Sequence, residues 1–465
     1  MRKFQISIII IIFVIILLPM IFFNRIENYR SNIDNKVLTN NPLGDNYQYS
    51  NFELFTNDMD SYVSERIGFR NEMIYAYTQL NKLCFQEMIA PLYIRGKEGY
   101  VFSKIEPNSS FSEYHMEFIN MIEKISNYCK ERDIPFVFVF NPSKNTVLQE
   151  YLPSGINYKT NWQDDFFNEL KKRNINYVDN RVSMKRLELD GVDVFNKQYD
   201  AGHWNNEGAF YGVNEILKNL QQFYPNLNLN NKSDYSIKMK SEQFLMQSYY
   251  EINDKVPYYS LRDDKEISNL TKQYEKEIKR NSNYQYFQYT QNKSLNKIDS
   301  PKTLVFQGSY MNEYGWKFLQ NQLSEYIAIH DYQNVINFDY YYNIFKPECV
   351  IFEVAEYTLS NNYFDMNEMQ NIKVNPVLEE SNMQFSEKVN LSALDMSQET
   401  GNRITNFTIK NLPNDTQYAY VRMAGETYDL KKEDGCFTVS IENSNVDKIQ
   451  KIIAITKNKN IVYER

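Results

Sequence analysis

The sequence predicts an α/β protein with a doubly wound parallel sheet flanked by helices, preceded by one transmembrane helix and followed by a small β-sandwich-like domain. Short apolar runs alternate with helical patterns from residue 113 to residue 354, as expected for right-handed βαβ units. Residues 4–23 are almost continuously apolar, and from residue 366 short alternating runs are divided by turn-prone segments. A chain of 465 residues is long enough for two or three domains.

The N-terminal apolar segment determines the expected location. Residues 4–23 carry no charge and match a hydrocarbon core of roughly 30 Å. Arg2 and Lys3 precede them, so the positive-inside rule keeps the N-terminus cytoplasmic and the remainder outside. No small-x-small cleavage site follows, which favours an anchor over the alternative, a cleaved signal peptide. We expect residues 1–24 to form a cytoplasmic tip and single-pass signal anchor in the cell membrane, and residues 25–50 a tether.

Residues 51–365 are predicted to form the α/β domain. Two helical patterns lie at 52–63 and 72–89, and a hairpin signal spans residues 93–102. Continuous apolar runs indicate buried strands, and helical spacing indicates the segments between them. The expected strands are 135–140, 175–179, 303–307, 326–329 and 349–354, with a short apolar piece at 192–195, and the expected helices are 113–132, 162–173, 206–223 and 312–323.

Two further regions depart from this alternation of strands and helices. Residues 226–300 are more polar, and we interpret them as an insertion with its own helices and hairpins, which either covers the site or is a surface excursion. Residues 366–465 contain alternating runs at 417–423, 436–441 and 451–456, which predict a β-rich C-terminal domain that serves as a glycan-binding or packing module.

Composition excludes several classes of function. The net charge of −8, without a lysine-arginine cluster, argues against a nucleic-acid partner, and 42% apolar residues indicate a globular protein. Four widely spaced cysteines without a C-x-x-C pattern indicate neither a zinc site nor a small disulfide scaffold. A single disulfide among the four remains an alternative. The sequence gives no reason to expect a metal or a cofactor.

Asp200-Ala-Gly-His203 is the most informative string for chemistry. The chain has only three histidines, and only His203 has a carboxylate at a useful local spacing. The pattern around His115 predicts a helix in which it lies at the surface or at the edge of the core. His330 ends a short apolar run and is expected near the end of a strand. Ser309 directly follows the expected strand at 303–307. Together these residues supply a nucleophile, a base and an orienting carboxylate.

Three candidate loops leave the carboxyl ends of the expected parallel strands, where reactive groups of such sheets gather. They comprise residues 141–144, 200–205 and 308–312. The backbone N–H of Ser309 is the first candidate donor to an oxyanion. A purely structural alternative makes Asp200 and Ser309 helix caps and His203 a core residue. The further candidates for oxyanion or substrate binding are Gly308, Asn141, Lys144, Trp204 and Asn205.

These blocks resemble the SGNH hydrolase-like O-acyltransferases, in particular the alginate O-acetylation proteins encoded beside membrane-bound O-acyltransferases. The resemblance covers roughly residues 51–360. The alginate proteins usually have one residue between the Asp and His, whereas this chain has two, as in many SGNH hydrolases. The resemblance rests on Glu65-Arg-Ile-Gly-Phe-Arg70, Arg95-Gly-Lys-Glu-Gly-Tyr-Val-Phe102, Asn141-Pro-Ser-Lys144, Leu152-Pro153, Asp200-Ala-Gly-His-Trp-Asn-Asn-Glu-Gly208 and Gly308-Ser309.

The resemblance implies an SGNH-like fold and a two-step transfer of an acyl group, usually acetyl. Ser309 would accept the group and pass it to a hydroxyl of a cell-wall or secreted polysaccharide, with His203 as base and Asp200 as orienting acid. A multi-pass membrane O-acyltransferase would deliver the acyl group from the cytoplasm. An esterase with the same triad, and a catalytically silent glycan-binding or assembly protein, are the alternatives.

Overall fold

The computed structural model describes residues 5–6, 13–14, 17–31, 33–34, 36–44, 52–85, 88, 92–104, 110–264 and 266–464. The expected anchor, residues 4–23, lies partly outside these ranges. Within them, we find no helix that is both long enough and apolar enough to span a bilayer. The expected tether contains one short antiparallel pair, β1 (Arg30–Ser31) with β2 (Lys36–Val37).

A seven-stranded sheet forms the centre of the molecule, in the order β6-β5-β13-β11-β12-β10-β9. The first five strands in this order run parallel, which confirms the expected α/β domain, and β10 and β9 pair antiparallel at the far edge. The carboxyl ends of β5, β11, β12 and β13 therefore meet at one edge. The strands are β5 (Phe136–Asn141), β6 (Tyr177–Asp179), β9 (Ile267–Asn269), β10 (Phe287–Asn292), β11 (Lys302–Gln307), β12 (Glu325–His330) and β13 (Cys349–Ala355).

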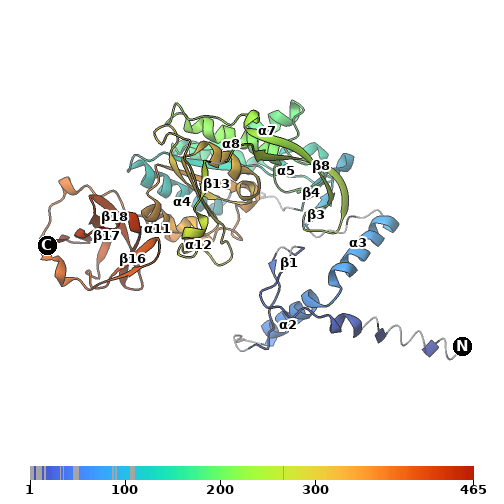
Figure 1. Cartoon of the computed structure of the whole chain (residues 1–465), viewed down its shortest axis with the longest axis horizontal. Coiled ribbons are helices and arrows are strands. Elements are labelled where there is room, and N and C mark those ends of the chain that lie inside the picture. Colours follow the sequence, from blue (N-terminus) through green and yellow to red (C-terminus); the bar gives the residue numbers. More distant parts are fainter. Residues whose placement is uncertain are drawn as a thin grey trace.

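Both faces of this sheet are covered by helices. Successive side chains of a strand point to opposite faces, and in the central strands nearly all of them are buried. In β5, Phe138 and Phe140 pack into one hydrophobic cluster and Val137 and Val139 into the other. One face is covered by α4 (Glu113–Lys130), α6 (Asn161–Lys172), α11 (Phe338–Phe345) and α12 (Met366–Asn371); the other by α7 (Asn180–Leu189), α8 (Asn206–Leu220) and α10 (Trp316–Gln322). Figure 1 shows these layers.

The segment at 226–300 differs from the expected insertion. Its second half supplies β9 and β10 to the central sheet, so the interpretation of this half as part of an insertion was wrong. The sequence did not indicate β10, because Gln288, Thr290 and Gln291 interrupt the continuous apolar run that is typical of a buried strand. Its first half forms a long antiparallel hairpin of β7 (Tyr235–Phe244) and β8 (Glu251–Leu261), followed by the short α9 (Thr271–Tyr274).

The hairpin β7–β8 supports the loop that carries Asp200. The Asp254 carboxylate on β8 accepts hydrogen bonds from the backbone N–H groups of Gln198 (2.7 Å) and Tyr199 (2.9 Å). These residues directly precede Asp200, so the hairpin fixes the approach of the chain to this residue.

The C-terminal region forms an eight-stranded sheet in the order β14-β21-β20-β17-β18-β19-β16-β15, and both halves of it contribute to one hydrophobic cluster. The helix α12 and Ile372 instead pack with the α/β domain, which therefore extends past residue 365. Figure 1 shows the β-rich domain, in red, at the end of the molecule opposite the N-terminus. The strands are β14 (Glu387–Asn390), β15 (Met396–Thr400), β16 (Ile404–Ile409), β17 (Thr416–Met423), β18 (Glu426–Glu433), β19 (Cys436–Glu442), β20 (Ile449–Thr456) and β21 (Asn460–Glu464).

Polar contacts attach the β-rich domain to the α/β domain. Asp429 on β18 accepts hydrogen bonds from the Tyr128 hydroxyl and from Arg132, and its backbone pairs with the side-chain amide of Asn343 on α11. Because Asp429 and Asn343 are buried, these bonds fix how the two domains face each other.

The N-terminal part of the described chain contains two further helices, α2 (Phe52–Arg66) and α3 (Arg70–Phe85), joined by a short turn. The expected hairpin is present as β3 (Tyr93–Arg95) and β4 (Val101–Ser103). Between β5 and β6, the chain also forms the short α5 (Lys144–Val147).

Close packing of α8 against Trp204 gives a test of the fold. Built at Gly212, a Cβ would lie 2.2 Å from the Trp204 ring, which is fully buried. Helix propensity alone favours alanine by about 1 kcal/mol, but overpacking of this kind costs about 1–3 kcal/mol. We expect Gly212→Ala to lower the free energy of unfolding in urea denaturation. Lys218→Ala, at an exposed position of the same helix, is the control; a stabilised Gly212→Ala would contradict this packing.

Candidate active site

Three side chains from different elements form a hydrogen-bonded chain at the carboxyl edge of the sheet. The Ser309 Oγ lies 2.8 Å from His203 Nε2, and His203 Nδ1 lies 2.6 Å from Asp200 Oδ1. With its proton on Nδ1, His203 donates to Asp200 and its Nε2 accepts the hydroxyl proton of Ser309. The predicted nucleophile, base and orienting carboxylate therefore meet in space, in the arrangement required for acyl transfer.

The electrostatics of this chain suit a general base. Burial alone would raise the pKa of the Asp200 carboxyl, but the charge of His203 and hydrogen bonds from His203 and Tyr314 outweigh burial and lower it. Burial likewise would lower the pKa of His203, but the Asp200 carboxylate outweighs it, so the pKa of His203 is raised. The lowered pKa favours the ionised form of Asp200, whose charge would stabilise an imidazolium at His203.

Local backbone geometry places each triad residue. Asp200 has a φ of +47°, a left-handed conformation that aspartate tolerates better than most residues. Asn205 caps α8 by accepting hydrogen bonds from the N–H groups of Glu207 and Gly208, which sets where the loop ends. Ser309 begins the helix that follows β11, and the N–H groups of a first helical turn have no acceptor within the helix.

Two tyrosines that the sequence did not indicate contact the triad. The Tyr357 hydroxyl lies 2.7 Å from Ser309 Oγ and 3.3 Å from His203 Nε2. The Tyr314 hydroxyl donates to the second carboxylate oxygen of Asp200. Tyr357 follows the carboxyl end of β13, in a fourth strand-end loop beyond the three that the sequence indicated. Its hydroxyl is placed to donate to negative charge that develops beside Ser309.

A π-helical turn, Met311–Gly315, directs Tyr314 toward Asp200. Such turns occur frequently at functional sites. The Tyr310 hydroxyl, one turn earlier, donates to the carbonyls of Pro142 and Gly202. The expected helix at 312–323 is thus present, but its irregular first turn connects the serine and aspartate loops.

Gly308 and Asn141 are joined by a carboxyl group beneath the nucleophile. Glu353 on β13 accepts from the Gly308 N–H (2.8 Å) and from Asn141 Nδ2 (2.6 Å). The side-chain oxygen Oδ1 of Asn141 accepts a hydrogen bond from the side-chain amide of Asn180. Asn141 thereby supports the serine loop through Glu353, and the oxyanion role suggested for Asn141 stays a prediction.

Lys144 and Trp204 have structural contacts. The Lys144 ammonium group is buried and donates to the carbonyls of Val101, Asn196 and Lys197, which occupy its three donors and leave none for an anionic substrate. Trp204 is fully buried, and its ring N–H donates to the Tyr310 carbonyl. The suggestion that these two residues bind substrate is therefore not supported by their contacts.

The remaining histidines and the cysteines lie outside the triad. His115 is buried beside the N-terminus of α4, and burial lowers its pKa to about 4. His330 ends β12, with Nδ1 3.2 Å from Asp331 Oδ1. All four cysteines are free. Among the residues that the structure describes, no group of three or more His, Cys, Asp or Glu side chains is placed to hold a metal ion.

A row of aromatic rings leads away from the nucleophile. Tyr357 contacts Tyr363 at 6.0 Å between ring centroids, Tyr363 contacts Tyr332 at 4.9 Å, and Tyr332 contacts Tyr284 at 4.9 Å. His330 packs beside the last two rings. Tyr332 is buried, whereas Tyr363 and Tyr284 are half-buried, so these two residues present part of their surface to solvent.

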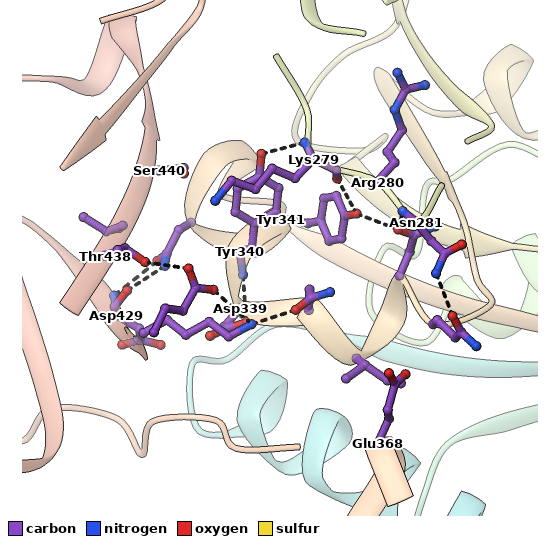
Figure 2. A pocket seen from close by; sticks show the side chains of 18 of the residues that line it. Lys279, Arg280, Asn281, Asp339, Tyr340, Tyr341, Glu368, Asp429, Thr438 and Ser440 are labelled. Atoms are coloured by element: carbon purple, nitrogen blue, oxygen red, sulfur yellow. Dashed lines mark hydrogen bonds and ion pairs between the residues drawn. The ribbon is translucent and has the colours of Figure 1, made fainter. Parts of the chain in front are cut away.

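Beyond this row lies a hollow of about 420 Å³ between α11 and the β-rich domain. Tyr284 connects the two, since its backbone carbonyl accepts from Asn334 in the hollow's lining. Figure 2 shows side chains of both domains around it, with Tyr340 and Asp339 on one side and Asp429 and Thr438 on the other. The lining combines amides, carboxylates and hydroxyls with tyrosine rings.

Comparison with protein families adds an independent finding. The family described as "SGNH hydrolase-like domain, acetyltransferase AlgX" matches residues 94–328, about half of the chain. The chain belongs to this family. Asp200, His203 and Ser309 all lie in the matched range, and the observed α/β sheet agrees with an SGNH-like fold. A comparison with curated protein sequences gave no match.

Solved structures of the same general kind are more distant. Bacillus cereus PatB1 with a sulfonyl adduct is 17% identical, covering 61% of this chain and all of that one, at a TM-score of 0.44. The O-acetyltransferase domain of Pseudomonas putida AlgJ is 16% identical over 61% of this chain and all of its own, at 0.41. Pseudomonas aeruginosa AlgX is 10% identical over 80% of this chain and 94% of its own, at 0.31. These values are too low for further inference.

In this AlgX-type family member, the raised pKa of His203 predicts a pH dependence. His203 accepts a proton only when neutral, so kcat/KM for an activated ester should fall as the pH drops through a pKa above the ordinary value of about 6.5. Asp200→Asn removes the charge that raises this pKa. We expect its acid limb to move to lower pH and its rate to fall by about 100-fold or more.

The measurement is the pH–rate profile of both proteins in matched buffers. Asp254→Asn is the control, because it alters a carboxylate that supports the same loop without contacting His203. An acid limb of Asp200→Asn at the same pH as in the unaltered protein would contradict the assigned coupling.

Proposed function

We propose that this protein is an extracytoplasmic, membrane-anchored O-acyltransferase that transfers an acyl group, usually acetyl, to a cell-wall or secreted polysaccharide. The hydrogen-bonded chain from Ser309 through His203 to Asp200 carries the proposal. Membership of an acetyltransferase family supports the choice of acyl group and of reaction.

In the first half-reaction, Ser309 Oγ attacks the carbonyl carbon of the acyl donor while His203 Nε2 takes the hydroxyl proton. The C=O electron pair moves onto oxygen, and this oxyanion receives hydrogen bonds from the Ser309 N–H and the Tyr357 hydroxyl. When the tetrahedral intermediate collapses, the bond to the leaving group breaks and His203 returns the proton to it. The products are acyl-Ser309 and the free donor alcohol or thiol.

In the second half-reaction, a sugar hydroxyl takes the position that the leaving group vacated. His203 removes its proton as the oxygen attacks the acyl-serine carbonyl, and the same donors hold the new oxyanion. Collapse breaks the bond to Ser309 Oγ, which recovers its proton from His203. The acceptor leaves as the ester, and a water molecule in its place would give the esterase reaction instead.

The aromatic row and the hollow support a polysaccharide acceptor. Sugar rings pack their apolar faces on aromatic side chains, and their hydroxyls pair with amides and carboxylates of the kind that line the hollow. A chain bound along the half-buried Tyr363 and Tyr284 would pass Ser309 and reach the β-rich domain. We propose glycan binding by the 366–465 region on this basis.

An acyl donor made in the cytoplasm must cross the membrane before Ser309 receives it. The sequence contains no acyl-carrier or coenzyme motif, so we propose that a multi-pass membrane O-acyltransferase delivers the group. Anchoring through residues 4–23 would hold the two proteins in the same membrane.

The proposed transfer is tested by incubating the protein with an activated acetyl ester and candidate glycans. We expect acetylated glycan to form ahead of free acetate, and both products to be lost in Ser309→Ala and His203→Ala, with residual rates about 10³-fold or more lower. Ser282→Ala, an exposed serine, is the control. Acetate release that no glycan diverts would favour the esterase, and a folded protein that never acetylates Ser309 would favour the silent binding protein.

Glycan binding at the hollow is tested separately in the Ser309→Ala background, where no turnover occurs. Tyr340 presents its ring to the hollow. We expect Tyr340→Ala to weaken glycan binding about 5-fold, equivalent to roughly 1 kcal/mol for a lost aromatic contact. Isothermal titration with oligosaccharides measures it, and Tyr258→Ala on β8 is the control. Equal affinities of the two variants would contradict this site.

A further inference from the structure

Helix α3 exposes an apolar stripe. Met73, Tyr77 and Leu80 follow each other at helical spacing and are 46%, 57% and 56% exposed, and Leu83 continues the stripe at 80%. Cys84, also exposed, lies beside Leu80 on the same face. Such a contiguous exposed apolar surface marks a contact site rather than ordinary surface composition.

The opposite, polar face of α3 packs on the body of the protein. The Tyr75 hydroxyl donates to Glu251 Oε1 (3.1 Å), Gln79 donates to the Tyr249 carbonyl (3.4 Å), and Lys82 donates to the Glu251 carbonyl (3.1 Å). These acceptors belong to the turn and second strand of the β7–β8 hairpin. A helix that packs on its own protein normally buries its apolar face. Helix α3 does the reverse, so its apolar stripe is directed outward.

The apolar N-terminal segment ends at the turn between α2 and α3. The Gly68 N–H donates to the Pro19 carbonyl (2.9 Å), and Phe22 packs on Phe69 with ring centroids 5.0 Å apart. A Cβ at Gly68 would lie 2.6 Å from the Cβ of Phe22, so only glycine allows this approach. The end of the apolar segment and the start of α3 therefore share one junction (Figure 1).

Arg66 makes this junction rigid. Its guanidinium is buried and donates to the carbonyls of Asn24, Ile26, Leu38 and Thr39 and to the Asn40 side chain. Arg70 forms a bidentate ion pair with Asp34 at 2.8 and 2.9 Å. The block Glu65-Arg-Ile-Gly-Phe-Arg70 thus holds the chain that leaves the apolar segment, which gives this motif a physical role.

From these contacts we propose that the apolar stripe of α3, comprising Met73, Tyr77, Leu80, Leu83 and Cys84, lies in the interface of the lipid bilayer beside the N-terminal anchor. The proposal rests on the membrane anchoring in the proposed function. An anchor held at the same junction keeps the stripe at high effective concentration next to the membrane, so little additional affinity is required. Two attachment points also fix the orientation of the body, which one flexible tether would not.

The test uses the full-length chain in phosphatidylcholine vesicles, with an environment-sensitive fluorophore on Cys84 and Cys436→Ser to remove the other accessible thiol. We expect the emission to shift to shorter wavelength on reconstitution and to lose most of its intensity when the lipid acyl chains are brominated. Leu80→Glu with Leu83→Glu should abolish both effects. Leu189→Glu, at an equally exposed position of α7, is the matched control and should leave them unchanged.

Each other result has a distinct meaning. A chain that floats with the vesicles while the Cys84 probe stays in water overturns the stripe proposal and leaves anchoring intact. A shift without quenching by brominated lipid means that protein covers the stripe, which also overturns it. A chain that does not float refutes the anchoring and the stripe together. Acetyl transfer by the same preparation is measured independently, so failure of the proposed chemistry is distinguishable from all three.

Discussion

The Glu353 carboxyl group is the contact on which the rest of the candidate site depends. It joins the ends of three neighbouring parallel strands, because it lies on β13 and accepts from Asn141 at the end of β5 and from Gly308 just after β11. Burial and the charge of Asp331 raise its pKa to about 8. A buried acid that is costly to ionise is retained here because it fixes the position from which the Ser309 helix begins.

The central sheet therefore positions the nucleophile, whereas contacts from the β7–β8 hairpin and from the serine helix position the base. Asp200 and His203 lie in a loop without regular structure, which the β7–β8 hairpin holds through Asp254 and which Tyr310 and Tyr314 connect to the serine helix. Such a loop needs several independent contacts, since each bond alone contributes only about 1 kcal/mol. Tyr310 and Tyr314 supply two of them from one helix, and Tyr314 does so from its π-helical turn.

The sequence was sufficient for the parts of the site that depend on local pattern. Ser309 directly follows an apolar strand, and Asp200 and His203 are close in the chain, so strand-end position and spacing predicted them. Tyr314 and Tyr357 were not predictable, because their contacts depend on an irregular helical turn and on a residue 48 positions from Ser309. Lys144 illustrates the opposite error: a lysine in a strand-end loop suggested a ligand for an anion, but burial among three carbonyls assigns it to the scaffold.

The positions of the site's neighbours constrain the direction of the proposed transfer. The aromatic row runs from Tyr357 toward the hollow at the β-rich domain, whereas α2, α3 and the N-terminus lie at the other end of the molecule. A donor delivered by a membrane protein would then reach Ser309 from the membrane end, and a long acceptor would approach from the opposite end. In the proposed mechanism both substrates use the same His203 nitrogen in turn, so separate approaches would allow the glycan to stay bound while the donor product leaves.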